Sequence, residues 1–193
     1  ANSIVQAGVN TMGTDQIAAW GICDKLNMLI WLMSDSMGPA LTTFVAQNLG
    51  AKNPERIRKG VIMGTSMSVG AVALISVGLF FFARILTPLF VSSQDAASLG
   101  VLVGTYSRMM APFFFFYAIA EALSGACCGT GDTVRPMITT LLAICLLRVI
   151  GILAVLPIYG TMECIVVIYI ASWIAAGVSF LALWRFDVAY ISK

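Results

Sequence analysis

Residues 42–60 read TTFVAQNLGAKNPERIRKG and form a strongly basic run between two long apolar segments. Pro54 lacks a backbone N–H and sets its own φ, so it favours the first turn of a helix, and the Asn and Gly residues before it favour a turn. We therefore expect one helix to end near Gln47 and the next to begin at Pro54. In a membrane protein, a cluster of Lys and Arg of this kind is retained on the cytoplasmic side.

The composition predicts an integral membrane protein. Hydrophobic residues make up 60% of the 193 residues and charged residues 10%, whereas an ordinary soluble domain has about 25% charged residues. The net charge of +2 is concentrated near one turn without interleaved aromatic residues, so no nucleic-acid partner is expected. The five cysteines form no CxxC pair and histidine is absent, so the sequence indicates neither a metal centre nor another cofactor.

The order of apolar segments and turns predicts an all-α polytopic fold, a single transmembrane lobe over residues 1–193. We expect the end of one helix at 1–12, followed by five complete transmembrane helices at about 16–47, 57–86, 99–128, 136–156 and 164–184. Each of the five reaches the roughly 20 residues that a bilayer requires. Because the chain starts inside a helix, we interpret it as a piece of a longer protein.

The basic residues outside these spans predict the orientation. With five crossings after residues 1–12, one side holds Arg84 alone, and the other side holds Lys52, Arg56, Arg58, Lys59, Arg135, Arg185 and Lys193. Loops rich in Lys and Arg stay in the cytoplasm. We therefore expect a multi-pass protein of the plasma (inner) membrane, with the 52–59 turn and the C-terminus both cytoplasmic.

Ionisable residues also occur inside the predicted spans, where each costs about 2.5–3.5 kcal/mol on insertion scales and must face protein or water. They are Asp24, Lys25, Asp35, Arg108, Glu121 and Arg148. With about 1.5 Å of rise per residue, Asp35 and Arg148 both lie about 18 Å from the cytoplasmic helix ends, so they could pair. Arg108 lies about 30 Å deep, and Asp24 and Lys25 about 33–35 Å deep, which predicts a second cluster near the outer surface.

Glu121 has no basic residue at a matching depth, since it lies only about 10 Å from the end of its helix. A buried carboxylate without a counter-charge can take up a proton or bind a monovalent cation, as an ion-coupled exporter requires. The alternative is a structural Glu that bonds serine or backbone groups at a helix crossing. The aromatic run 113–117, FFFFY, could hold flat organic cations by stacking and cation–π attraction, although at least two of its rings must face lipid or a neighbouring helix.

Two turns carry a resemblance to a known family. The segment 46–53, AQNLGAKN, followed by Arg56, resembles the cytoplasmic turn after the second helix of a lobe in the multidrug and toxic compound extrusion (MATE) family. The segment 122–133, ALSGACCGTGDT, followed by Pro136, is similar to the turn that joins the fourth and fifth helices of such a lobe. The resemblance covers nearly the whole chain. It implies the second, C-terminal six-helix lobe of a two-lobe, twelve-helix transporter in the MOP flippase superfamily.

This resemblance implies a secondary active antiporter, not an enzyme, that exports organic cations or drugs in exchange for Na⁺ or H⁺. Its expected partners are membrane lipid, the missing N-terminal lobe and small organic cations as substrates. In the cation-coupled branch an acidic residue lies one turn before Glu121, where this chain has Tyr117. The candidate ion-coupling and substrate residues are therefore Glu121, Tyr117, Asp35 and Asp24, with Arg148, Arg108 and Lys25 as charge partners inside the membrane.

Three other functions are weighed against export. A lipid-linked saccharide flippase of the same superfamily should have a more cationic cavity than three basic and three acidic intramembrane residues provide. An intramembrane enzyme is disfavoured because the sequence has no histidine and neither an HExxH nor a GxSxG motif. A non-transporting membrane scaffold remains an alternative that ion-dependent efflux would exclude.

Overall fold

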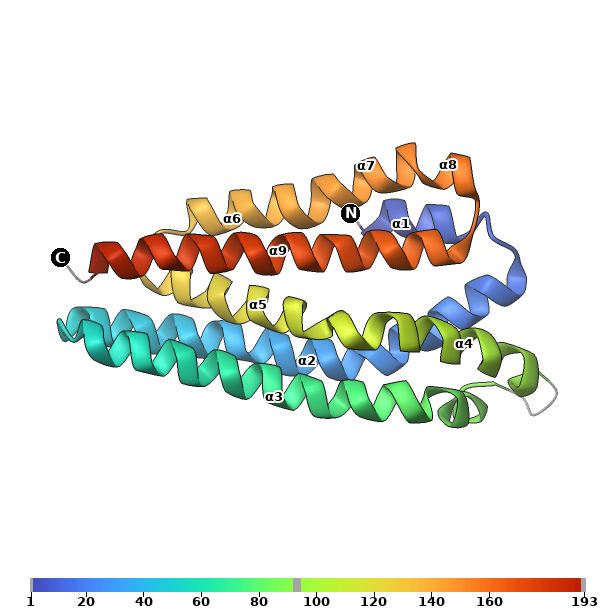
Figure 1. The fold of residues 1–193 in the computed structure, drawn as a ribbon, viewed down its shortest axis with the longest axis horizontal. Coiled ribbons are helices and arrows are strands. Elements are labelled where there is room, and N and C mark those ends of the chain that lie inside the picture. Colours follow the sequence, from blue (N-terminus) through green and yellow to red (C-terminus); the bar gives the residue numbers. More distant parts are fainter. Residues whose placement is uncertain (1, 92–94, 192–193) are drawn as a thin grey trace.

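The computed structural model describes residues 2–91 and 95–191, and all regular secondary structure in these ranges is helical. Figure 1 shows the main helices lying side by side along one long axis. In chain order the elements are α1 (Asn2–Val9), α2 (Thr14–Gly50), α3 (Pro54–Leu86), η1 (Thr87–Leu89), α4 (Ala96–Met110), η2 (Ala111–Phe113), α5 (Phe114–Gly129), α6 (Val134–Thr140), η3 (Leu141–Leu146), α7 (Leu147–Ala154), α8 (Leu156–Tyr159) and α9 (Met162–Ile191).

The turn between α2 and α3 forms where the sequence predicts it. The helix α2 ends at Gly50, and α3 begins at Pro54. Asn53 caps α3, since its side-chain oxygen accepts a hydrogen bond from the backbone N–H of Arg56 at 3.1 Å. Lys52 adopts a φ of 53°, the left-handed conformation that reverses the chain here. The basic residues are thereby placed together at one end of the bundle.

Two of the predicted spans are interrupted helices. The third consists of α4 and α5 joined by the 3₁₀ turn η2, which contains Pro112. Proline cannot donate to the helical hydrogen-bond ladder, so the break falls at this residue. The fourth consists of α6 and α7 joined by the π-helical turn η3.

The helix α5 lies at the centre of the bundle and packs against α2, α3 and α9, while α6 and α7 run along α9. The crossing of α2 and α5 depends on two glycines. A Cβ atom added to Gly125 would lie 2.1 Å from the carbonyl oxygen of Gly38. At the same crossing the hydroxyl of Thr42 donates to the carbonyl oxygen of Gly125 at 2.8 Å. Small residues at such a contact let two helical backbones approach closely in a membrane.

Within the described residues, four helical segments are long and apolar enough to cross a bilayer: Pro54–Leu89, Ala96–Gly129, Val134–Tyr159 and Met162–Asp187. Four of the five predicted spans correspond to these segments. The span predicted at about 16–47 corresponds to α2, which is not one of the four but runs beside them along the bundle (Figure 1). Large apolar side chains on the outer surface, such as Leu74 at 78% exposure, form the face expected against lipid. The chain is therefore an all-helical, polytopic integral membrane protein.

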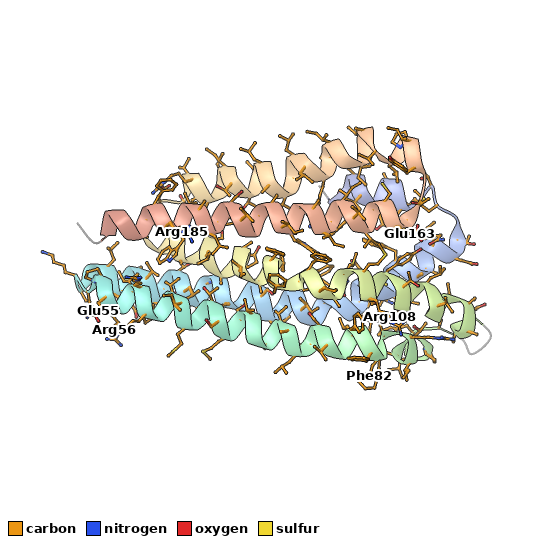
Figure 2. All side chains as sticks on the ribbon, in the orientation of Figure 1. Glu55, Arg56, Phe82, Arg108, Glu163 and Arg185 are labelled. Atoms are coloured by element: carbon orange, nitrogen blue, oxygen red, sulfur yellow. The ribbon has the colours of Figure 1, made fainter. Side chains whose placement is uncertain are left out.

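The basic turn and the C-terminal end of α9 lie at the same end of the bundle. Figure 2 shows Arg56 and Arg185 near that end and Arg108 toward the opposite end. Lys193, which the charge count also includes, lies outside the described residues. The two segments predicted to be cytoplasmic are thus on one side of the structure.

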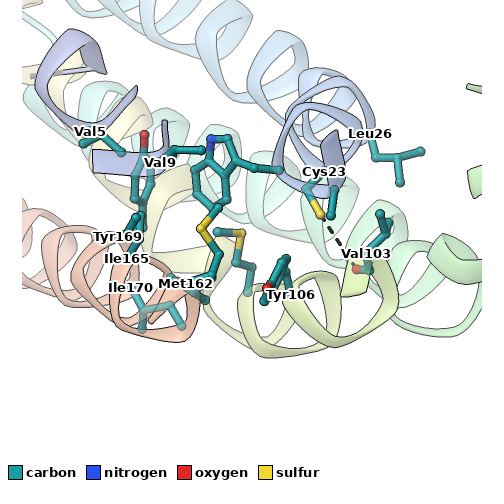
Figure 3. Packing of buried hydrophobic residues seen from close by; sticks show 14 of the residues in the cluster. Val5, Val9, Cys23, Leu26, Val103, Tyr106, Met162, Ile165, Tyr169 and Ile170 are labelled. Atoms are coloured by element: carbon teal, nitrogen blue, oxygen red, sulfur yellow. Dashed lines mark hydrogen bonds between the residues drawn. The ribbon is translucent and has the colours of Figure 1, made fainter. Parts of the chain in front are cut away.

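The apolar core is continuous where α1, α2, α4 and α9 meet (Figure 3). Val5, Val103 and Tyr106 are fully buried there. Cys23 lies in this core, where its thiol contacts the carbonyl oxygen of Val103 at 3.8 Å. The cysteines are free thiols, and Cys23 packs as a small apolar side chain.

Candidate functional site

A cavity of about 270 Å³ lies between α1, α2, α5, α7 and α9. Its charged lining consists of Asp24 and Asp35 from α2 and Arg148 from α7, with Gln6 from α1 as a further polar group. Four of these helices are distant from one another in sequence. The cavity therefore exists only in the folded bundle.

Aromatic side chains make up much of the remaining lining. They are Trp20, Trp31, Tyr117, Tyr169 and Trp173. The ring centroids of Tyr169 and Trp173 are 5.9 Å apart in an edge-to-face arrangement, and those of Trp20 and Tyr169 are 5.3 Å apart. Such contacts hold the rings in fixed orientations and stabilise the wall.

One face of α2 supplies half of the charged and aromatic wall. Trp20, Asp24, Trp31 and Asp35 are spaced at i, i+4, i+11 and i+15, which places them on one side of a helix. Asp24 and Asp35 are both exposed in this chain. This face of α2 is therefore polar and aromatic where it meets the cavity. A charged side chain inside a membrane must face protein or water rather than lipid, and this face of α2 meets that requirement.

Asp35 and Tyr117 are joined directly. The Tyr117 hydroxyl donates to a carboxylate oxygen of Asp35 at 2.8 Å. The helices that carry them are in close contact at Gly38 and Gly125. Gly38 lies about one turn after Asp35 on α2, and Gly125 lies about two turns after Tyr117 on α5. The close helix contact thus sets the geometry of the hydrogen bond.

Arg148 is buried, with 6% exposure, and has neighbours that stabilise its charge. Its Nε donates to the Ser172 hydroxyl at 3.0 Å, and its guanidinium lies 3.9 Å from the ring centroid of Tyr169. A cation over an aromatic face is stabilised by the ring quadrupole, more so away from water. Asp35 and Arg148 line the same cavity, and their direct pairing stays a prediction.

Glu121 lies one helical turn after Tyr117 and is half-buried beside the crossing of α2 and α5. A Cβ atom added to Gly38 would lie 3.4 Å from the Glu121 carbonyl oxygen. Glu121 does not line the cavity itself. It lies next to the Asp35–Tyr117 pair.

Arg108 and Lys25 have neighbours elsewhere. The Nε of Arg108 donates to the carbonyl oxygen of Phe80 at 3.3 Å, and its guanidinium lies 6.0 Å from the Phe80 ring centroid. Lys25 Nζ lies 5.8 Å from the ring centroid of Phe90. Within the described part of the chain, no ion pair joins either residue to Asp24. The three residues predicted to cluster near the outer surface are therefore separate: Asp24 faces the cavity, and the two basic residues lie against aromatic rings.

The aromatic run 113–117 contributes one residue to the cavity, Tyr117. Phe114 is fully buried against Trp173, with ring centroids 4.9 Å apart, and Phe115 is 36% exposed on the outer surface. The sequence reasoning missed Trp20, Trp31, Tyr169 and Trp173. The spacing of the two tryptophans with Asp24 and Asp35 on α2 was the available signal for half of them.

The residues described contain no group of three His, Cys, Asp or Glu side chains arranged to hold a metal ion. The site is instead a cavity with two carboxylates, one buried guanidinium and a rigid aromatic wall, backed by a third carboxylate. Such a wall can bind a flat organic cation, and the carboxylates can carry a proton or a monovalent cation.

Residues 2–153 match the family model described as MatE. The chain belongs to the MATE family. It is 24% identical over 144 residues to the probable multidrug resistance protein YpnP of Bacillus subtilis, an alignment that covers 75% of this chain and 32% of YpnP. It is 28% identical over 90 residues to the FAD transporter of Shewanella oneidensis, covering 47% of this chain and 20% of that protein. The chain thus spans about a third or less of these curated relatives.

The fold of this MATE chain also matches a solved structure. The crystal structure of the eukaryotic MATE transporter AtDTX14 superimposes with a TM-score of 0.75 at 20% sequence identity, covering 91% of this chain and 40% of AtDTX14. At this identity the match establishes a shared fold. The match extends beyond the family model, which ends at residue 153, so the likeness also includes much of the region that contains α9.

Proposed function

We propose that this MATE chain is the C-terminal lobe of a secondary active antiporter that exports organic cations in exchange for Na⁺ or H⁺. The observation that carries the proposal is the cavity in which Asp24 and Asp35 face an aromatic wall. Carboxylates attract a cation, and ring faces bind its flat, apolar body without requiring one particular substrate shape. Such a combination suits a transporter of varied organic cations.

Ion coupling is assigned to Asp35, Tyr117 and Glu121. An antiporter needs acidic groups that alternate between an ion-bound form and an ion-free form, and that are placed so that substrate and ion compete. Asp35 lines the cavity, whereas Glu121 lies beside it, one helical turn after the Tyr117 that bonds Asp35. A proton or Na⁺ bound by these acidic side chains would neutralise part of their negative charge.

The complete transporter, in this proposal, contains a second lobe on the open side of the cavity. Substrate sites in transporters built from repeats lie between the repeats, near the middle of the membrane. The exposed carboxylates of Asp24 and Asp35 would face the N-terminal lobe across the substrate path. The protein is placed in the plasma (inner) membrane with its basic turn and C-terminus in the cytoplasm, as the distribution of Lys and Arg favours.

Export of an anionic compound is the second candidate. It is favoured by Arg148 in the cavity lining and by the likeness to the FAD transporter of Shewanella oneidensis. Arg148 already contacts Tyr169 and Ser172, whereas the Asp24 and Asp35 side chains are exposed. The accessible charge in the cavity is therefore acidic, and we rank a cationic substrate first.

The test uses the full-length transporter that carries this lobe, reconstituted in vesicles with an imposed Na⁺ or H⁺ gradient. Efflux of a fluorescent organic cation is measured beside efflux of FAD, and cation binding is measured separately. The variant Glu121→Gln keeps the shape and hydrogen bonding of the side chain but cannot ionise. We expect it to abolish gradient-driven cation efflux while retaining binding and membrane insertion, because removing an intramembrane charge does not raise the insertion cost.

The matched control is Glu163→Gln, an exposed acid at the start of α9 outside the cavity, which should transport normally. Asp35→Asn should weaken cation binding by about tenfold, the loss of one charge-assisted contact of about 1.5 kcal/mol. Full gradient-driven efflux by Glu121→Gln would return Glu121 to a structural role at the helix crossing. Gradient-driven FAD efflux without cation efflux would favour the second candidate, and no efflux of either compound would favour a scaffold.

A further inference from the structure

A second pocket, of about 450 Å³, lies at the turn between α2 and α3, far from the substrate cavity. Its polar side is formed by Asn53, Glu55, Arg56 and Lys59, all within the first turns of α3 or the residue that caps it. In sequence, this basic turn indicates the orientation of the chain in the membrane.

The opposite side of the pocket is apolar, and a glycine shapes it. The ring of Phe44 from α2 packs so closely on Gly60 that an added Cβ atom would lie 2.2 Å from a ring carbon. Met63 continues the wall and is 66% exposed, and Met67, one turn further, is 63% exposed. Lys59, Met63 and Met67 are spaced four residues apart, so they lie in one stripe on α3.

The charges in the pocket are unevenly compensated. Lys59 Nζ lies 2.6 Å from a carboxylate oxygen of Glu55, an ion pair on the exposed surface. The Arg56 side chain has no ion pair within the part of the chain that the structure describes. Arg56 is exposed in the same pocket. An accessible, uncompensated guanidinium therefore lies directly beside an apolar stripe.

We propose that this pocket binds one anionic phospholipid, with its phosphate at Arg56 and Lys59 and an acyl chain along Met63 and Met67. Position supports this occupant, because the apolar span Pro54–Leu89 begins at this turn. The pocket is therefore at the level where headgroups meet hydrocarbon. A guanidinium binds phosphate through two parallel hydrogen bonds. Basic pockets at the ends of membrane helices attract anionic headgroups, and the exposed methionines accept a flexible chain.

The experiment titrates the purified full-length transporter that carries this lobe in a zwitterionic detergent with dioleoylphosphatidylglycerol, and it follows thermal unfolding and the lipid retained in native mass spectra. Dioleoylphosphatidylcholine tests the headgroup charge, and inorganic phosphate tests whether the phosphate alone suffices. We expect phosphatidylglycerol to raise the melting temperature more than either probe. Arg56→Gln should bind phosphatidylglycerol about fivefold more weakly, since each basic residue near a membrane surface contributes about that factor.

Arg58→Gln is the matched control, because it removes the same charge two residues away, from an exposed side chain that does not line the pocket. It should keep the affinity of the unmodified chain, and Arg56→Lys should retain more affinity than Arg56→Gln. Equal weakening by Arg56→Gln and Arg58→Gln would mean diffuse surface attraction and would overturn the proposal. It would also be overturned if phosphatidylcholine or inorganic phosphate stabilised the chain as strongly as phosphatidylglycerol.

Discussion

Asp35 joins the cavity lining to the helix that carries Glu121. It accepts a hydrogen bond from Tyr117 and lines the cavity with Arg148, and Glu121 follows Tyr117 by one helical turn. Its side chain is also exposed. In the proposed transporter, Asp35 would therefore be accessible to a cation while lining the same cavity as Arg148.

The first prediction concerns Asp35 and Arg148. If their charges compensate one another, Asp35→Asn or Arg148→Gln alone removes one partner of the interaction, and the double variant removes both charges. We expect the double variant to be less destabilised than the sum of the singles, by about 0.5–3 kcal/mol, in reversible unfolding in detergent. Tyr117→Phe, which removes the hydroxyl bonded to Asp35, is the reference for loss of a neutral hydrogen bond. Additivity within about 0.5 kcal/mol would mean that the two charges do not interact.

The second prediction concerns Asp132, in the loop before α6. The side chain of Arg135 bonds the Asp132 carboxylate, and backbone N–H groups of Val134 and Arg135 add to this, so the pKa of Asp132 lies below its ordinary value. A carboxyl whose pKa is lowered by folding stabilises the fold above its unfolded pKa, and that contribution is lost as the pH falls through the folded pKa.

Asp132→Asn should therefore flatten part of the acid side of the stability curve, measured as melting temperature against pH. In an Arg135→Gln background, where the first cause of the shift is gone, Asp132→Asn should change the curve much less. An equal effect of Asp132→Asn in both backgrounds would show that Arg135 does not set this pH dependence.

At the scale of elements, the contact between α2 and α5 determines how the cavity is built. The two helices cross at Gly38 and Gly125 without side chains between them, and Asp35 and Tyr117 meet about one to two turns away. Arg148 comes from α7 and Tyr169 from α9. The helix α7 packs on α9, and α9 in turn packs on the central helix α5. A shift of α2 on α5 would therefore separate the Asp35–Tyr117 pair.

The third prediction tests that contact. Gly125→Ala adds a methyl group where the Gly38 carbonyl would lie 2.1 Å away, so the helices must separate. Overpacking of this kind costs about 1–3 kcal/mol. We expect lower unfolding stability in detergent. Gly70→Ala is the control, since a Cβ atom there meets nothing within 4 Å. Equal stability of the two alanine variants would mean that α2 and α5 can separate without cost.

At the scale of the whole molecule, the bundle separates its charged groups by end. The 52–59 turn and the C-terminal part of α9 lie at one end, and the turn between α8 and α9 lies at the other (Figure 1). Between the ends, large apolar side chains cover the outer surface. This arrangement gives two ends that must lie on opposite sides of a membrane.

The fourth prediction assigns those sides. In a background with the native cysteines replaced, a cysteine at position 53 should resist an impermeant thiol reagent added to intact cells and react after the membrane is opened. Position 161 lies between α8 and α9, and that turn is at the opposite end of the bundle (Figure 1), so a cysteine there should react in intact cells. Labelling of position 53 from outside would reverse the orientation inferred from the basic residues.

The sequence by itself determined the membrane class, the basic turn and the identities of the charged residues in the spans. These follow from local properties: the length of apolar runs, the restricted φ of Pro54 and the cost of charge in lipid. Asp24, Asp35 and Arg148 were chosen on that basis, whereas Tyr117 was chosen through the resemblance to the MATE family. All four line the cavity. Glu121 was chosen for the same reason as the other charged residues, but it lies beside the cavity and is not part of its lining.

Only the tertiary structure decided which of those residues meet. Depth along a helix says nothing about rotation around it, so Arg108 and Lys25, chosen in the same way, lie against Phe80 and Phe90 instead. Trp173 and Tyr169 belong to α9, which is apolar on all sides in sequence and reveals no inward face until it packs on α5. In a membrane the helices are apolar against lipid and against each other, so close packing at residues such as Gly38 and Gly125, rather than a polar–apolar pattern, determines the rotation.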